Sequence, residues 1–249
     1  MPDPVLEAVN VEKTFPNGIV AVDDVSLSVG EGETVVLIGE SGCGKTTLLR
    51  HFNRLEEPTS GEIRIEGEQA GRIDPIELRR RTGYVQQEGG LLPHWTVARN
   101  VALVPRLLGW DGDRIEKRVR ELLDLVGLDY QRYKDSYPAH LSGGQRQRVA
   151  FARALAADPH VILMDEPFGA LDALTRLEMQ DEFLKLKERL KKTMLLVTHD
   201  LDEGVRLADR LAIMKDGRLH QVAAPQELIE NPATDYVASL LKLRSGDGQ

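Results

Sequence analysis

The chain has 249 residues, of which 41% are apolar and 29% are charged, and its formal net charge at pH 7 is −8. This composition provides for a buried core and excludes a disordered or fibrous protein, while the acidic balance argues against a general nucleic-acid-binding surface. The single cysteine, Cys43, excludes an internal disulfide and a cysteine-based zinc site. The first residues lack a secretion-signal pattern, and no apolar run approaches the roughly 20 residues that cross a bilayer. We therefore expect a cytoplasmic protein that reaches any membrane through a partner.

Apolar runs and turn signals predict an α/β chain. The first 30 residues and the stretch Gly61–Gly67 read as short alternating strands, which indicates an antiparallel piece. By contrast, "TVVLIG" at 34–39, "VILMD" at 161–165 and "TMLLVT" at 193–198 are nearly uninterrupted apolar runs, as in parallel strands buried on both faces. Residues from about 88 to 157 are helical in character with few strand signals, which predicts an inserted helical subdomain.

The last third of the chain alternates in the same way. After the run at 161–165, apolar residues recur at helical spacing and predict an amphipathic crossover helix: Met179, Phe183, Leu186 and Leu190. The segment "RLAIMKDGRLHQVA" at 210–223 has two alternating runs around Asp216-Gly217, which is a hairpin signal. The tail from 223 to 249 is expected to be helical or loose.

The turn between the strand at 34–38 and a helix beginning near Lys45 reads "GESGCGKTT". It satisfies the G-x-x-x-x-G-K-[ST] pattern in a strand-to-helix context, where glycines let backbone N–H groups curl around an anion. Lys45 would reach the β- and γ-phosphates, and the Thr46 hydroxyl would bind Mg²⁺. The alternative, a glycine-rich turn that only caps a helix, leaves the lysine and threonine unexplained. The predicted nucleotide-binding residues here are Gly39, Glu40, Ser41, Gly42, Cys43, Gly44, Lys45, Thr46 and Thr47.

A second acidic element follows the strand in "VILMDEP". Asp165 at the strand end would contact Mg²⁺, usually through water, and Glu166 is the candidate general base beside the γ-phosphate. Adjacent acidic residues at a strand end are also common in solvated loops, so the pair predicts a catalytic site only in combination with the phosphate loop.

The segment "LSGGQRQRVAFARAL" at 141–155 decides between the many classes of P-loop protein. Here the chain closely resembles the ATP-binding subunits of ABC transporters, whose LSGGQ motif stands unaltered shortly before "VILMDEP". Ser142, Gly143 and Gly144 open the N-terminus of a helix and can grip a γ-phosphate, and Gln145 completes the motif. As plain sequence, the same residues would also read as a helix cap with Ser142 at the N-cap.

The resemblance covers residues 1 to about 240 and implies further roles. Phe15 matches the aromatic residue that stacks on adenine. Gln87, six residues before Pro93, matches the glutamine that touches Mg²⁺ and the attacking water; Gln86 is the alternative. Asp172 in "GALD" matches the aspartate that reaches across a dimer interface. His199, at the end of the strand 193–198, matches the histidine that contacts the γ-phosphate, and a strand's carboxyl end is where α/β sheets place ligands.

The family implies a P-loop NTPase (RecA-like) core with an antiparallel β subdomain and an inserted helical subdomain. We expect an ATP-binding domain over 1–240, with the core at 1–87 and 158–222 and the helical subdomain at about 88–157, followed by a helical tail at 223–249. Two copies would sandwich two ATP molecules with Mg²⁺, each loop facing the partner's LSGGQ, and hydrolysis would separate them. The helical subdomain would transmit this movement to a membrane permease through a groove near Gln87. The expected location is the cytoplasmic face of the membrane.

The transported solute is predicted from regional likeness only. The segments at 80–110 and 224–241 look most like the ATPases of quaternary-amine and osmolyte importers, for glycine betaine, choline, carnitine or proline. One alternative is an importer ATPase for an amino acid, a sulfonate or nitrate. Another is a non-transport ABC ATPase acting on DNA or ribosomes, which usually has two ATPase units or a coiled-coil insertion. The run Arg79-Arg80-Arg81 is most simply a solvated face, so we expect no nucleic-acid partner.

Overall fold

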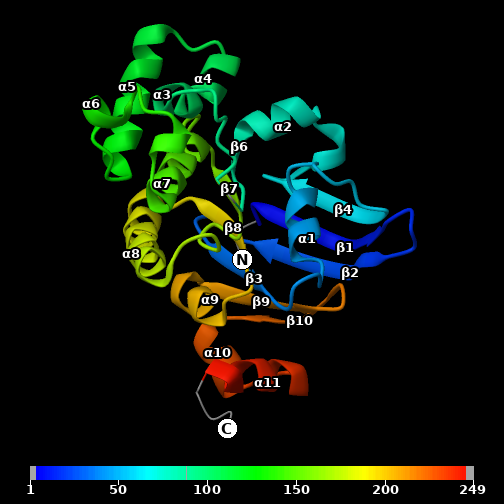
Figure 1. The fold of residues 1–249 in the computed structure, drawn as a ribbon. Helices are drawn as coiled ribbons and strands as arrows, with labels where there is room; N and C mark the ends of the chain where they lie inside the picture. The colour runs from blue at the N-terminus through cyan, green and yellow to red at the C-terminus, as the bar shows by residue number, and fades with distance from the viewer. Residues whose placement is uncertain (1–3, 88, 245–249) are drawn as a thin grey trace. The chain divides into compact units, whose positions relative to one another are not determined.

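A computed structural model describes residues 4–87 and 89–244. Contacts divide the chain into two compact units, one made of Met1–Leu78 and Lys191–Gln249 and the other of Arg79–Leu190. Figure 1 shows the helices and strands of both units. Among the described residues, no helix has the length and apolar character needed to span a membrane.

The first unit contains an antiparallel sheet in the order β2-β1-β4-β5. Its strands are β1 (Leu6–Thr14), β2 (Val20–Val29), β4 (Ser60–Ile65) and β5 (Glu68–Gln69). β1 pairs with both long neighbours, with Leu6 opposite Val29 on one side and Ile65 on the other. Buried and exposed residues alternate along the later part of β2, as expected for a sheet with one covered face. The antiparallel piece predicted from the first 30 residues and from 61–67 is confirmed.

The same unit holds four strands in the order β10-β9-β3-β8: β3 (Thr34–Ile38), β8 (Thr193–Thr198), β9 (Arg210–Lys215) and β10 (Arg218–Ala223). β3 lies parallel to β8 and β9, and every residue of β3 and β8 is buried. β9 and β10 form the predicted hairpin around Asp216 and Gly217. Both turn residues have positive φ, 50° and 81°, as a two-residue type I′ turn requires.

Short helices complete the first unit. They are α1 (Lys45–His51), the 3₁₀ turn η1 (Ala70–Arg72), α9 (Leu201–Leu207), α10 (Pro225–Glu230) and α11 (Asp235–Arg244), while α2 (Pro75–Arg81) contains the unit boundary. α9 packs so closely on β3 that the side chain of Ile38 occupies the space where a Cβ of Gly204 would lie. Within the described part of the predicted tail, α10 and α11 are helical.

The second unit has two parallel strands, β6 (Thr82–Val85) and β7 (Val161–Asp165), with Thr82 opposite Val161. Between them the described residues form helices, as expected for an inserted helical block: α3 (Val97–Val101), α4 (Leu103–Leu107), α5 (Gly112–Leu125), α6 (Tyr130–Tyr133), the 3₁₀ turn η2 (Pro138–His140) and α7 (Gly143–Ala154). The long helix α8 (Ala173–Leu190) follows β7. Phe151, Phe168 and Phe183 form a buried aromatic cluster with ring centroids about 6 Å apart.

Candidate nucleotide site

The loop Gly39–Thr47 joins the buried strand β3 to α1, and its glycines are required by close packing. A Cβ at Gly39 would overlap the carbonyl oxygen of Met214, and one at Gly44 would overlap that of Ala21. Gly44 also has φ 104°, a conformation that disfavours any L side chain. The loop therefore adopts its shape because two backbone carbonyls, from β9 and β2, press against positions that have no side chain.

Lys45 is buried within this loop, with only 5% of its surface exposed. Its ammonium donates to the carbonyl oxygens of Gly39 at 2.7 Å and Glu40 at 2.8 Å, and it lies 3.8 Å from the Cys43 sulfur. Burial raises the pKa of the Cys43 thiol, although the nearby ammonium opposes this shift. The thiol therefore behaves as loop packing, since a reactive cysteine needs a lowered pKa. The other loop side chains, Glu40 and Ser41, are exposed, and Thr46 and Thr47 are half-buried.

His199 and the phosphate loop leave the sheet at the same edge. β3 and β8 are adjacent parallel strands with Ile38 opposite Thr198, so the next residues, Gly39 and His199, emerge side by side at the carboxyl ends. The His199 side chain is exposed there. Phe15 is half-buried in the turn between β1 and β2, where its backbone N–H donates to the carbonyl of Ile19 at 2.9 Å. The first unit thus brings the loop and His199 together, while Phe15 belongs to the turn that leads into β2.

The second unit brings Gln87 to Glu166. Asp165 is the last residue of β7 and is 3% exposed. Glu166 follows with φ 44°, an uncommon left-handed conformation for a residue with a side chain, of the kind that often marks functional sites. The Gln87 side-chain amide donates to a Glu166 carboxylate oxygen at 3.1 Å. Of the two adjacent glutamines, Gln87 is thus the one that reaches the candidate base.

Arg153 supports the segment that carries Gln87. From the end of α7, its guanidinium donates to the carbonyl oxygens of Gly89 at 2.7 Å and Gly90 at 2.6 Å. Burial lowers the pKa of this guanidinium. Sequence reasoning missed this residue, because the contact joins positions more than 60 residues apart and leaves no local pattern.

The LSGGQ motif at 141–145, the signature of this chain, begins α7 with a complete capping box. The Ser142 hydroxyl accepts from the Gln145 N–H at 3.2 Å, and the Gln145 side chain accepts from the Ser142 N–H at 3.0 Å. Gly143 and Gly144 pack against the "GALD" turn: a Cβ at Gly144 would stand 2.8 Å from the Thr175 methyl group, and one at Gly143 would be 3.4 Å from Leu171. The signature and GALD segments are therefore neighbours.

Asp172 caps the start of α8. Its carboxylate accepts from the Thr175 N–H at 3.1 Å, and hydrogen bonds from the Thr175 hydroxyl and N–H hold the pKa of this exposed carboxyl below its usual range. The Asp172 carboxylate therefore stays charged at neutral pH, and its hydrogen bond to the Thr175 N–H fixes it at the start of α8.

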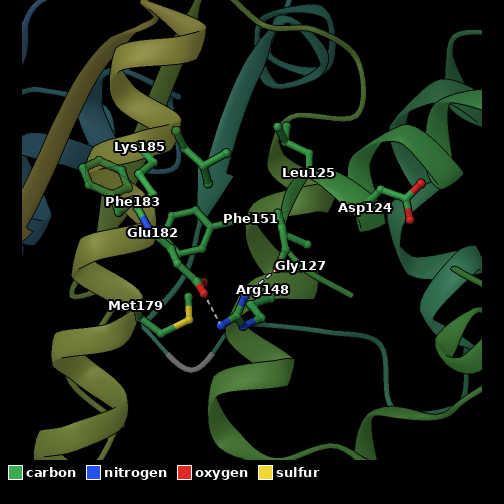
Figure 2. A pocket seen from close by; sticks show the side chains of 11 residues that line it. Asp124, Leu125, Gly127, Arg148, Phe151, Met179, Glu182, Phe183 and Lys185 are labelled. Carbon is green, nitrogen blue, oxygen red and sulfur yellow. Dashed lines mark hydrogen bonds and ion pairs between the residues drawn. The ribbon is translucent and has the colours of Figure 1, made fainter. Parts of the chain in front are cut away.

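A pocket of about 180 Å³ lies beside the signature helix, between α7, α8 and the turn after α5. Figure 2 shows the Arg148 side chain pointing toward Glu182; its guanidinium donates to the Glu182 carboxylate at 2.5 Å and to the Val126 carbonyl at 2.7 Å. None of the predicted site residues lines this pocket. The Arg148 contacts link α7 to α8 and to the turn after α5.

In the described part of the chain, no group of three or more His, Cys, Asp or Glu side chains is placed so that it could hold a metal ion. The Thr46 hydroxyl in the first unit and the Asp165 carboxylate in the second are oxygen donors of the kind that suit Mg²⁺, which is usually held by one or two protein ligands together with phosphate oxygens and waters. Each is therefore chemically suited to a metal that arrives with a nucleotide.

The strand–loop–helix arrangement around Gly39–Thr47 defines a P-loop nucleotide-binding protein. The family model "ABC transporter" matches residues 22–169, and the chain belongs to that family. It is 50% identical over 93% of its length to the choline transport ATP-binding protein OpuBA of Bacillus subtilis (strain 168). It is 51% identical over 89% of its length to the osmoprotectant import ATP-binding protein OsmV of Salmonella typhimurium. The chain spans 61% and 58% of the lengths of these two relatives.

A solved structure supports the same fold. An ATP-binding cassette in a dimeric, post-hydrolysis state bound to ADP and Pi is 37% identical, with a TM-score of 0.78 over 88% of this chain and 98% of that one. The fold is accordingly that of an ABC ATPase cassette, a P-loop α/β core with an antiparallel sheet and a helical block. The domain boundaries and the roles of individual site residues stay predictions.

Proposed function

We propose that the chain binds ATP at the Gly39–Thr47 loop and hydrolyses it to drive solute import. The observation that carries this proposal is the shaped loop with Lys45 buried at its centre. Backbone N–H groups of such a loop suit phosphate oxygens, and the ammonium adds positive charge where the β- and γ-phosphates would lie. Phe15 would stack on the adenine ring. The similar cassette bound to ADP and Pi supports this use of the loop.

Hydrolysis would use the Gln87–Glu166 pair. Glu166 would accept the proton of the attacking water, Gln87 would orient that water, and His199 would hydrogen-bond the γ-phosphate. Mg²⁺, when bound, would neutralise developing charge on the phosphates, with Thr46, Asp165 and Gln87 as its protein ligands. The uncommon backbone conformation of Glu166 supports a functional role for its placement.

We infer that two copies of the chain act together. In that arrangement Ser142, Gly143, Gly144 and Gln145 of one copy face the γ-phosphate held by the loop of the other, and Asp172 reaches across the interface. The similar cassette is dimeric, which supports this inference. ATP would then favour the closed pair, and loss of the γ-phosphate would remove the contact that distinguishes the closed state from the open one.

A permease would dock in a groove of the second unit. A cavity of about 290 Å³ is bordered by β6, by the helical block and by the segment that carries Gln86 and Gln87, here called the glutamine segment. It is lined by apolar and cationic side chains that include Tyr84, Leu92, Leu103, Val104, Arg79 and Arg80, and it includes Gln86 beside the predicted catalytic Gln87. Arg153 lines the same cavity and holds the glutamine segment, so a partner seated there would contact the support of Gln87. The chain would act peripherally, on the cytoplasmic face of the membrane.

The solute class we propose is a quaternary amine or related osmolyte, such as glycine betaine, choline, carnitine or proline. The similarity to the choline and osmoprotectant transport proteins supports it. An importer ATPase for another solute, such as an amino acid, a sulfonate or nitrate, would keep every catalytic residue unchanged.

Replacement of the candidate base tests the ATPase proposal. Glu166→Gln should retain ATP binding, lower turnover by roughly two to four orders of magnitude because proton acceptance is lost, and accumulate an ATP-bound dimer on size-exclusion chromatography. Glu188→Gln, at an exposed position of α8, is the matched control and should hydrolyse ATP normally. Turnover of Glu166→Gln near the wild-type rate would remove Glu166 from the base role.

Uptake tests the solute. Cells with the wild-type chain or Lys45→Ala should be compared for uptake of labelled glycine betaine, choline, carnitine and proline. Loss of uptake of one of these solutes with Lys45→Ala identifies the transported solute. Unchanged uptake of all four would show that the solute belongs to another class. The ATPase proposal is tested separately by Glu166→Gln.

A further inference from the structure

The C-terminal helix α11 is anchored on the β9–β10 hairpin. Figure 1 shows α11 close to β10, and the Tyr236 ring packs with the His220 ring of β10 at a centroid distance of 5.3 Å. The Lys215 ammonium of β9 lies 4.5 Å from the centre of the same tyrosine ring, within the range of a cation–π contact. Gln221 binds the segment before α11 through the Asn231 carbonyl at 2.9 Å and the Ala233 N–H at 2.8 Å. Tyr236 is therefore held in one place by both strands.

The same hairpin supports the phosphate loop. The Gly217 N–H donates to the Cys43 carbonyl at 3.1 Å, and the Met214 carbonyl fills the space beside Gly39. The β9–β10 hairpin therefore contacts both the phosphate loop and Tyr236. A shift of α11 would act on an element that directly contacts the loop.

The Tyr236 hydroxyl lies next to the loop itself. Glu40, Cys43 and Asp216 are its charged and polar neighbours, and the Glu40 backbone N–H lies near the phenol oxygen. Burial raises the pKa of this phenol. Within the described residues, the buried hydroxyl has no partner that meets normal hydrogen-bond geometry, so the Glu40 N–H lies beside it without completing a good bond. A buried unsatisfied hydroxyl is uncommon and calls for an explanation.

One peptide unit separates this hydroxyl from Lys45. The peptide between Gly39 and Glu40 presents its N–H to Tyr236, while its carbonyl oxygen accepts from the Lys45 ammonium at 2.7 Å. Because a peptide is planar, fixing its N–H also fixes the direction of its carbonyl. The tyrosine thus acts on the lysine through a rigid group.

We propose that Tyr236 is a positioning residue of the nucleotide site: its hydroxyl accepts a hydrogen bond from the Glu40 N–H when the loop closes on a nucleotide. That bond fixes the Gly39–Glu40 peptide and aims Lys45 at the phosphates. The proposal rests on the nucleotide site proposed above and makes nucleotide affinity depend on the Tyr236 hydroxyl.

The test is calorimetric titration of the full chain with ADP and Mg²⁺. Tyr236→Phe keeps the ring contacts and removes the hydroxyl, so it should raise the ADP Kd about three- to tenfold, the effect of one hydrogen bond. Tyr236→Ala should raise it at least as much. Val237→Ala is the matched control, because Val237 is the fully buried neighbour on α11 and its truncation weakens packing while keeping the Tyr236 hydroxyl. We expect Val237→Ala to lower the melting temperature and leave the Kd within twofold.

Two further readouts separate positioning from general support. In steady-state ATPase assays, Tyr236→Phe should raise KM and leave kcat within twofold, since the reacting groups are unchanged. Cys43 is the only cysteine in the chain and is 8% exposed, so its labelling rate with a maleimide reports on the loop. Tyr236→Ala should accelerate labelling without nucleotide, and ADP should slow it.

Two results would overturn the inference: a wild-type ADP Kd for Tyr236→Phe, or an equal rise in Kd for Val237→Ala. Lys45→Ala separates this failure from failure of the nucleotide site. If Lys45→Ala loses ADP binding while Tyr236→Phe does not, only the tyrosine proposal fails. If Lys45→Ala binds ADP normally, the nucleotide site itself is wrong.

Discussion

The glycine-containing turns before α1 and α7 differ in how the helix N-terminus is satisfied. The turn Gly39–Gly44 before α1 has no side-chain cap, and its N-cap residue is Gly44. The turn before α7 is closed by Ser142 and Gln145, each of which accepts a backbone hydrogen bond from the other. The turn before α1 therefore leaves backbone N–H groups available to a ligand. In the turn before α7, side chains of the turn itself accept hydrogen bonds from the backbone N–H groups of Ser142 and Gln145.

This difference has an energetic consequence for the signature motif. A phosphate that took the Ser142 hydroxyl away from its cap would forfeit about 1 kcal/mol of helix stability. The phosphate loop has no such cap to give up, although its shape depends on tight backbone packing. A nucleotide should accordingly bind first at the loop, with the signature joining when a second copy supplies further contacts.

Steric substitution in the phosphate loop should give the largest effect. Gly44→Ala places a Cβ against the Ala21 carbonyl at φ 104°, so it should destabilise the protein by more than about 4 kcal/mol or abolish ADP binding. Gly42→Ala is the matched control, because Gly42 also has positive φ, 81°, but a Cβ there meets no atom within 4 Å. It should cost only about 1–2 kcal/mol. Urea unfolding and ADP titration measure both, and equal effects would show that backbone conformation, not packing, shapes the loop.

The sequence predicts this loop because local pattern and local structure coincide. "TVVLIG" is a strand buried on both faces, and β3 has all five residues buried. The strands at 161–165 and 193–198 and the hairpin at 210–223 follow for the same reason. Even the Ser142 cap was visible as an alternative reading, since an N-cap depends on residues within one turn of helix.

Other features depend on contacts between distant residues. β6 was not predicted, because "TGYV" has only four residues and includes a glycine, and so short a segment shows no recognisable hydrophobic periodicity. The pattern places a glycine at 44 but does not reveal that Ala21 of β2 presses on it. Tyr236 acts next to Glu40 from almost 200 residues away, and a tail with weak patterning gave no sign of this.

A second prediction tests packing at the signature turn. Gly144→Ala brings a Cβ within 2.8 Å of the Thr175 methyl, and a β-branched side chain has little freedom to yield. We expect a loss of about 1–2 kcal/mol in urea unfolding, less than at Gly44 because a side chain gives way more readily than backbone. Thr175→Ser removes that methyl and keeps the hydroxyl, so the double variant should regain most of the loss. Failure of this rescue would contradict the steric account, and Gly143→Ala, with 3.4 Å of space, serves as the tolerant control.

The capping box itself gives a smaller effect. Ser142→Ala removes the acceptor for the Gln145 N–H and should lower the free energy of unfolding by about 1 kcal/mol. Ser142→Thr preserves a hydroxyl and should recover most of it. ADP affinity should stay unchanged, because ADP has no γ-phosphate to reach the signature. A change in ADP affinity would show that the two turns are coupled before a second copy binds.

The smallest expected effect lies at the far end of α1, where His51 is 1% exposed. Its Nδ1 lies 2.9 Å from the Glu56 carbonyl, and burial lowers the pKa of the imidazole, an effect that the Glu56 carbonyl opposes and Lys13 reinforces. An unfolded histidine titrates near 6.5, so the unfolded chain binds the proton first and stability falls as the pH drops through that value. Between pH 7 and pH 6 this single group can remove at most about 0.7 kcal/mol. Urea unfolding at both pH values should show a steeper loss for the wild type than for His51→Gln, whereas His140→Gln, at an exposed position, should keep the wild-type slope. If His51→Gln kept the wild-type slope as well, His51 would not contribute to the pH dependence of the free energy of unfolding.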